Sequence, residues 1–311
     1  MLPCEVHLDR GLISGIVRTA VERCITSSGL SRIPNSPAEL FNSSQANSIK
    51  AEIIRAGRKL WTRQYVDGSG GNISARISPE YVISTPTMLS KGDLRVEDLS
   101  LVDLENRQIV GARPQTSEIL LHLEIYKAVP DARAVIHCHP PYATAHAVAG
   151  IVPQGNLVSE QELFIGPVAL AAYETPGTMA FAKAVLPLVR GHNTILLSNH
   201  GLVCWADSVT HAEWYTEVVE TYCKTLVIAK QLRPDLIEIP SSKITDLLTL
   251  KKRLGLPDPR LPVDESPVPA SAEIVALESG YVFPHDVSDF EIELLVSRLS
   301  GEIVQFLEEQ A

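Results

Sequence analysis

Cysteine is scarce in this 311-residue sequence, and its pattern excludes one class of protein. The five cysteines are odd in number, widely spaced and form no C-x-x-C pair: Cys4, Cys24, Cys138, Cys204 and Cys223. Small secreted domains held together by disulfides carry an even number of cysteines in a dense framework, so this class is excluded. We therefore expect reduced thiols and a cytoplasmic location.

The sequence also lacks long hydrophobic runs and an excess of positive charge. No apolar stretch approaches the roughly 20 residues that span a bilayer, and the N-terminus has early acidic residues instead of the apolar segment of a signal peptide. The formal net charge of -10 comes from 27 basic and 37 acidic residues and repels nucleic acid and anionic lipid. We expect no membrane segment, no nucleic-acid partner and a small-molecule ligand.

Hydrophobic periodicity indicates a mixed α/β fold. Residues 47–66 place Ile49, Ile53, Ala56, Leu60 and Trp61 at helical spacing, which predicts an amphipathic helix. Short β-rich runs separated by turn residues predict antiparallel strands. The predicted strands are 72–77, 81–85, 99–105, 108–112, 133–139, one near 168–173 and two within 193–206, and the later helices are 116–129, 141–148, 178–190 and 209–231.

Because strands and helices do not alternate strictly, these elements favour a helix-covered, mainly antiparallel β-sheet over a doubly wound fold. The predicted domain covers residues 46–231. Residues 1–45 are expected to be an N-terminal extension with a helix at Leu12–Cys24. Residues 232–311 are expected to be a C-terminal extension with a proline-rich linker and a terminal amphipathic helix.

The run "AVIHCHPP" at residues 134–141 ends an apolar strand in two histidines. Side chains alternate along a strand, so His137 and His139 point to one face and Cys138 to the other. Two neutral imidazoles side by side are suitable zinc ligands. The alternative is that they are ordinary polar residues at a strand end.

A catalytic zinc site needs three protein ligands and an open position. His200, in the turn of "LLSNHGLV", is the third candidate, and its alternative is a simple hairpin-turn residue. Glu118 follows Thr116 and Ser117 at a predicted helix start. These residues can merely cap the helix, or its N–H groups can hold a phosphate or carboxylate while Glu118 reaches a metal or a substrate C–H bond.

Six segments follow one another in a fixed order: GSGGNISAR (68–76), STPTMLSKGDLRVEDLSLVDLE (84–105), QTSE (115–118), HCHPPYATAHA (137–147), YETPGT (173–178) and SNHGLVCWADSVTHAEWYTEVVE (198–220). Together they resemble the class II aldolase/adducin family, which includes sugar-phosphate aldolases, an epimerase and a dehydratase. The resemblance covers about residues 47–230.

The resemblance implies a role for each matched position. His137, His139 and His200 would bind a divalent metal, usually zinc, with manganese or cobalt as alternatives. Glu118 would be the general base and, in some resting states, a fourth ligand. The resemblance also implies a cyclic homotetramer with active sites between subunits, and a set of residues that hold the substrate phosphate: Gly71, Asn72, Thr87, Thr116 and Ser117.

Two departures from the family pattern concern the substrate pocket. Met88 stands where family members commonly have glycine, which predicts a narrowed or altered phosphate pocket. A tyrosine acid expected after the H-x-H helix has no clear counterpart in "QGNLVSEQELFIG". Glu160 and Glu162 in this segment are possible acids or bases, and the alternative for each is a solvated charge.

The resemblance implies a divalent-metal-dependent lyase, an aldolase that acts on a small ketose or ketose phosphate through a metal-stabilised enediolate. Epimerase, dehydratase and decarboxylase reactions on the same fold are alternatives, because they need only a different placement of the acid. A non-catalytic, adducin-like interaction module is a further alternative. A barrel-type metal hydrolase is disfavoured, because repeated βα units and a late metal-binding aspartate are not evident.

Overall fold

Eight strands of the described residues form one sheet in the order β4-β3-β2-β1-β5-β8-β7-β6. The structure, a computed structural model, describes residues 36–261, which lie in one compact unit, Ser36–Asp264. Neighbouring strands are antiparallel except β6 and β7. The strands are β1 Asn72–Arg76, β2 Tyr81–Ser84, β3 Ser100–Asp103, β4 Gln108–Val110, β5 Ala134–Cys138, β6 Ala169–Ala171, β7 Thr194–Leu197 and β8 Gly201–Ala206.

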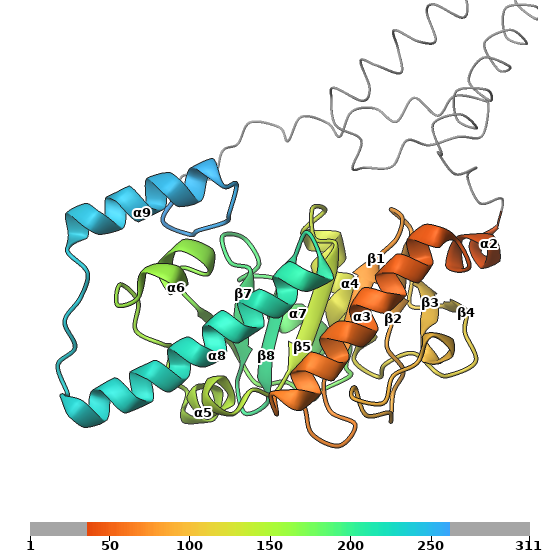
Figure 1. Cartoon of the computed structure of the whole chain (residues 1–311), viewed down its shortest axis with the longest axis horizontal. Coiled ribbons are helices and arrows are strands. Elements are labelled where there is room, and N and C mark those ends of the chain that lie inside the picture. Colours follow the sequence, from red (N-terminus) through yellow and green to blue (C-terminus); the bar gives the residue numbers. More distant parts are fainter. Residues whose placement is uncertain (1–35, 262–311) are drawn as a thin grey trace, which may run out of the picture. The chain divides into compact units, whose positions relative to one another are not determined.

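Helices cover both faces of this sheet, which confirms the predicted fold class. Figure 1 shows the long helices α3 and α8 crossing the same face. None of the described helices is long and apolar enough to cross a bilayer. The helices are α2 Pro37–Phe41, α3 Ser44–Thr62, α4 Ile119–Ala128, α5 Pro141–Ala149, α6 Ser159–Phe164, α7 Met179–Ala184, α8 Val209–Leu232 and α9 Ser241–Arg253, with a 3-10 turn at Val96–Asp98.

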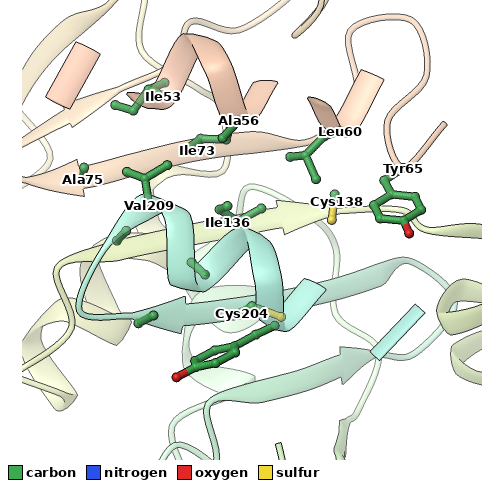
Figure 2. Close-up of a cluster of buried hydrophobic side chains, with 14 of the residues drawn as sticks. Ile53, Ala56, Leu60, Tyr65, Ile73, Ala75, Ile136, Cys138, Cys204 and Val209 are labelled. Atoms are coloured by element: carbon green, nitrogen blue, oxygen red, sulfur yellow. The ribbon is translucent and has the colours of Figure 1, made fainter. Parts of the chain in front are cut away.

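Strand alternation divides the core into two clusters, one on each face of the sheet. The first cluster packs side chains of α3, α5 and α8 against alternate residues of the central strands, including Ile136, Cys138 and Cys204. Figure 2 shows Cys138 and Cys204 in this cluster. The second cluster packs α4 and α7 against the intervening residues, such as Val135 and Val203. The two cysteines therefore lie behind the sheet, as expected, and their burial raises the pKa of both thiols.

The amphipathic helix predicted at residues 47–66 is confirmed as α3, and one other predicted boundary in the N-terminal half is wrong. Trp61 of α3 is 52% exposed, and its ring covers Gly92. The helix predicted from residue 116 begins at Ile119. The preceding residues are held in an extended loop: Thr116 donates its N–H to the Thr85 carbonyl, and Gln115 forms a β-bridge with Pro86.

The C-terminal half also differs from the expectation. Helix α7 ends at Ala184 and not near residue 190, because the residue before Pro187 is disfavoured in the helical conformation and proline supplies no N–H. Helices α2, α6 and α9 were not predicted. The compact unit extends beyond the predicted domain limits at both ends. The extensions themselves stay a prediction, and the helices expected near Leu12–Cys24 and at the C-terminus lie outside the described residues.

A buried ion-pair cluster joins α9 and the segment after it to α6. The Lys251 ammonium lies 3.1 Å from the Asp258 carboxylate, and both side chains are fully buried. Arg260 binds Asp258 at 2.8 Å and the buried Glu162 at 2.7 Å. Burial lowers the pKa of Lys251, whereas hydrogen bonds and charge from Arg260 and Lys251 outweigh burial and lower the pKa of Asp258. Each charge in the cluster therefore depends on its partners.

Replacing Asp258 by alanine is expected to lower the free energy of unfolding by about 3 kcal/mol, because it leaves the Lys251 charge buried without its partner. Asp246→Ala is the matched control, since Asp246 forms an exposed pair with Lys243 at 3.0 Å. The control should change stability by less than about 1 kcal/mol. Urea unfolding of the three proteins measures both values, and equal losses in the two variants would contradict the burial argument.

Candidate functional site

Three imidazoles converge at one end of the central strands. His137 lies at the end of β5, where it faces Asn72 of β1 and Val203 of β8 across the ladder. His139 follows β5 directly, and its backbone N–H donates to the Tyr65 carbonyl. His200 comes from the turn that joins β7 and β8. One nitrogen from each of the three rings lies within 4.8 Å of the others, and the ring centroids are 4.7–5.1 Å apart.

The turn and the following helix place these residues by identifiable contacts. Asn199, before His200, adopts a left-handed φ of 55°, which asparagine tolerates better than most residues. After His139, helix α5 begins with the N–H groups of Tyr142 and Ala143 donating to the buried Glu220 carboxylate of α8. A carboxylate at a helix N-terminus stabilises the helix, so α8 anchors the histidine segment from behind.

Backbone contacts fix which nitrogen of His137 is free. Its Nδ1 lies 2.8 Å from the Leu202 carbonyl oxygen, which can only accept, so Nδ1 carries the proton. The Nε2 lone pair then faces Nε2 of His139 at 3.1 Å. Metal-binding histidines characteristically donate their other ring N–H to a carbonyl in this way.

Burial keeps all three histidines neutral. It is the largest cause that lowers the pKa of His137, His139 and His200, although Glu118 raises the pKa of the last two. Neutral imidazole is the form that binds a metal. The buried Nδ1 of His200 has no hydrogen-bond partner. Three neutral rings cannot supply hydrogen-bond donors for all of their converging nitrogen lone pairs. This set of lone pairs fits a divalent cation such as zinc.

The Glu118 carboxylate lies beside the three-histidine cluster. Glu118 is the residue before α4, with a non-helical ψ of 19°, and its side chain does not cap the helix. Its two carboxylate oxygens lie 3.4 Å from His137 Nε2 and 3.5 Å from His200 Nε2. The Asn72 amide nitrogen donates to it at 2.7 Å. The structure thus brings together the four residues predicted as the metal and catalytic set.

The five positions predicted to hold phosphate lie on three neighbouring segments. Gly71 has φ +68°, and a Cβ there would lie 2.5 Å from Val66 and 3.0 Å from the His137 carbonyl oxygen, so only glycine fits. Thr87 is half-buried and Ser117 is exposed, whereas Asn72 and Thr116 are buried. The Asn72 side chain already binds Glu118 and His122. The predicted role of all five positions in phosphate binding stays a prediction.

Met88 has an unusual conformation for a bulky residue. Its φ is +53° and its side chain is 81% exposed. The left-handed region costs a non-glycine residue about 1 kcal/mol, which explains why glycine suits this position. The predicted effect on the pocket stays a prediction.

Glu160 and Glu162, the possible acids or bases, lie on α6. Glu160 is exposed, whereas Glu162 is buried and binds Arg260 and the Asn156 N–H. None of the contacts described for these two glutamates involves the three histidines. Their role in catalysis stays a prediction.

Two polar residues beside the site were missed from the sequence. Lys91 is 1% exposed, its ammonium donates to the carbonyls of Ser69 and Leu89, and burial lowers its pKa to about 8. It joins the glycine-rich loop to the Met88 loop, and no sequence signal marked it. The second residue, His122, binds the Asn72 side chain through Nε2. It lies four residues after Glu118, and this spacing on a helix could have linked the two.

Acidification is expected to destabilise the metal-free protein. Burial lowers the pKa of His122 from 6.5 to about 3, so below pH 6.5 the unfolded chain binds a proton that the folded chain does not. The free energy of unfolding then falls as pH falls, by about 1.4 kcal/mol per unit for this group. Urea unfolding at about pH 7.5 and about pH 5.5 should show a smaller loss for His122→Gln than for wild type. An equal loss would contradict a neutral His122.

The three histidines and Glu118 form a donor set that fits a divalent cation. A model of the family described as "Class II Aldolase and Adducin N-terminal domain" matches residues 51–227. The chain belongs to the class II aldolase/adducin family, as its motifs predicted. The curated relatives carry the names of enzymes, which confirms the predicted class of enzyme, a class II aldolase-type lyase.

Three similar proteins illustrate the relationship. An L-fuculose phosphate aldolase of Methanococcus maripaludis is 36% identical over 183 residues, which are 58% of this chain and 98% of that protein. A 3-oxo-tetronate 4-phosphate decarboxylase of Haemophilus influenzae is 30% identical over 179 residues, 56% of this chain and 85% of that protein. A solved L-fuculose 1-phosphate aldolase superposes with a TM-score of 0.62 at 26% identity, covering 68% of this chain and 97% of that one.

Proposed function

We propose that this protein is an aldolase that cleaves, or forms in reverse, a small ketose phosphate with the help of a divalent cation, zinc by preference. The observation that carries the proposal is the convergence of His137, His139 and His200 with Glu118. Three histidines leave an open position on a tetrahedral cation, as catalytic zinc sites require. An interaction module without a metal would have no physical need for this set.

The phosphate part of the proposal is supported by the segments around the histidines. Gly71 brings the backbone close to the end of β5, and Thr87 and Ser117 offer hydroxyl groups that are not buried. Backbone N–H groups and hydroxyls of this kind bind phosphate without a net positive protein charge. Two relatives named above, the aldolase and the decarboxylase, carry phosphorylated sugars or sugar acids in their names.

A bound divalent cation would act as a Lewis acid toward the substrate's carbonyl and hydroxyl oxygens. His137, His139 and His200 would hold it, and the Leu202 carbonyl keeps His137 in the ligand form. Glu118 would carry the proton to or from the carbon at which the C–C bond breaks, since its carboxylate lies beside the cluster. Asn72 holds one carboxylate oxygen of Glu118 during this step.

The decarboxylase reaction is the second candidate, because the Haemophilus influenzae relative is 30% identical and has that name. Both reactions leave an anion at carbon next to a carbonyl and differ in the group that departs. An aldehyde leaves in the first and carbon dioxide in the second. The products therefore separate the two candidates directly.

The proposed oligomeric state and cellular location rest on other observations. We propose a cytoplasmic homotetramer with residues 1–45 and 232–311 as extensions. Cys138, Cys204 and Cys223 are free thiols, which fits a reducing compartment. The family resemblance supports the tetramer. Light scattering on the full chain at micromolar concentration should give four times the monomer mass of 33.9 kDa.

The experiment that tests the function is a product screen of the zinc-loaded protein. Ketose 1-phosphates and 3-oxo-acid 4-phosphates are incubated with wild type and with Glu118→Gln, and proton NMR follows aldehyde formation and loss of the carboxyl group. The proposal expects aldehyde release from a ketose phosphate with wild type only. Carbon dioxide release alone would select the decarboxylase, and no reaction with either panel would overturn the proposed lyase.

A further inference from the structure

A continuous hydrogen-bond chain runs from the interior of the protein to Glu118. The Tyr126 hydroxyl lies 2.9 Å from the Ser74 hydroxyl, which lies 2.7 Å from Nδ1 of His122. Nε2 of His122 lies 2.5 Å from Oδ1 of Asn72, and Nδ2 of Asn72 lies 2.7 Å from Glu118. Tyr126 and His122 lie on α4, on the same helix that Glu118 precedes, while Asn72 and Ser74 lie on β1.

The hydrogen bonds from Tyr126 to Glu118 can all form with only one assignment of donors and acceptors. An ionised Glu118 carboxylate only accepts, so the Asn72 NH₂ group must face it and the amide oxygen must face His122. Nε2 of His122 must then carry the proton, and its Nδ1 must accept. Ser74 therefore donates to His122 and accepts from the Tyr126 hydroxyl. Each hydrogen bond therefore has one possible donor, which fixes both the tautomer of the ring and the orientation of the amide.

Because these groups are buried, the opposite assignment of donors and acceptors would cost free energy. His122 and Ser74 are fully buried, and Asn72 and Tyr126 are nearly so. An unsatisfied polar group costs most where water cannot replace the lost partner. Reversal of the amide would also place its oxygen against the Glu118 carboxylate. Burial keeps His122 uncharged through the physiological range, because it lowers the pKa of the ring to about 3.

We infer that His122 is a positioning residue: as the Nε2–H tautomer it fixes the orientation of the Asn72 amide, which in turn holds the Glu118 carboxylate beside His137 and His200. The catalytic consequence rests on the proposed function, whereas the tautomer and the amide orientation do not. Without the His122 hydrogen bond, the Asn72 amide would no longer be a fixed donor to Glu118. The Glu118 carboxylate would then sample positions away from the reacting carbon.

Two measurements test the inference separately from the proposed function. The first is ¹⁵N NMR of histidine-labelled full-length protein without metal, with the His122→Gln spectrum used to identify the signals of His122. The inference expects a single neutral ring with protonated Nε2 and unprotonated Nδ1, unchanged between about pH 6 and about pH 8. A ring protonated on Nδ1, or a ring that titrates in this range, would overturn it whether or not the protein is an aldolase.

The second measurement is steady-state kinetics with the substrate found in the product screen. His122→Gln keeps a donor near the position of Nε2 and should retain most of kcat. His122→Leu removes the donor and should lower kcat about 10- to 100-fold, with little change in KM or metal content, as loss of an orienting partner does. Equal kcat in wild type and His122→Leu would overturn the positioning role. If His122→Leu does not fold, the NMR result on wild type decides.

Discussion

Glu118→Gln is expected to lower kcat by about 10²- to 10⁴-fold while the bound metal is retained. The carboxylate is the only acidic side chain within 4 Å of both His137 and His200 among the described residues, so no described neighbour can take over the proton transfer. Glutamine keeps the size of the side chain but cannot accept a proton at physiological pH. Metal content should stay near wild type, because three histidines suffice to hold the ion.

Glu124→Gln is the matched control for this variant. Glu124 lies on α4, the helix that Glu118 precedes, and forms an i,i+3 pair with Lys127 at 3.0 Å. Its replacement should leave kcat within about twofold of wild type, since its described partner is Lys127 and not one of the three histidines. Kinetics and plasma mass spectrometry on the same samples separate chemistry from metal binding. Full activity of Glu118→Gln would remove this residue from the mechanism.

Gly201→Ala is expected to disrupt the metal site by a steric route. A Cβ at Gly201 would lie 2.5 Å from the Cys138 carbonyl oxygen and 2.6 Å from the His139 ring. Both contacts are too short, and the backbone of β5 cannot move without shifting His137. We expect a loss of about 1 to 3 kcal/mol in unfolding free energy, and a metal affinity at least about tenfold weaker.

Gly150→Ala serves as the control for this glycine. Gly150 also needs a positive φ, of 67°, but a Cβ there meets nothing within 4 Å. It should cost about 1 kcal/mol through backbone strain and leave metal affinity unchanged. Isothermal titration with zinc and urea unfolding measure the two quantities. Wild-type zinc affinity in Gly201→Ala would contradict the tight packing described here.

Strand alternation explains why the centre of the site was predictable. The position of His137 beside His139, with Cys138 on the opposite face, follows from the two-residue period of a strand. The contribution of His200 required only a turn between two apolar strands. The predicted helix start singled out Glu118, and the family resemblance supplied its role and the phosphate positions. These residues lie on the segments next to the histidines.

The rest of the site depends on contacts between distant segments. The start of α4 is delayed because Thr116 pairs with Thr85, which no local propensity encodes. Glu162 sits in a charged segment that reads as solvated, yet it is buried because Arg260 arrives from nearly a hundred residues away. His122 looks like a core residue of a helix until β1 brings Asn72 and Ser74 against it. Periodicity cannot reveal such partners.

Metal content shows whether His137, His139 and His200 hold a divalent cation. Wild type, His139→Ala and His146→Ala are purified without chelator, dialysed and measured by plasma mass spectrometry. His146 is the control, since its Nδ1 lies 2.9 Å from the Tyr142 carbonyl of its own helix. We expect about one divalent ion per chain in wild type and in His146→Ala, and little in His139→Ala. A wild type that stays metal-free even after reconstitution with zinc, manganese or cobalt would contradict it.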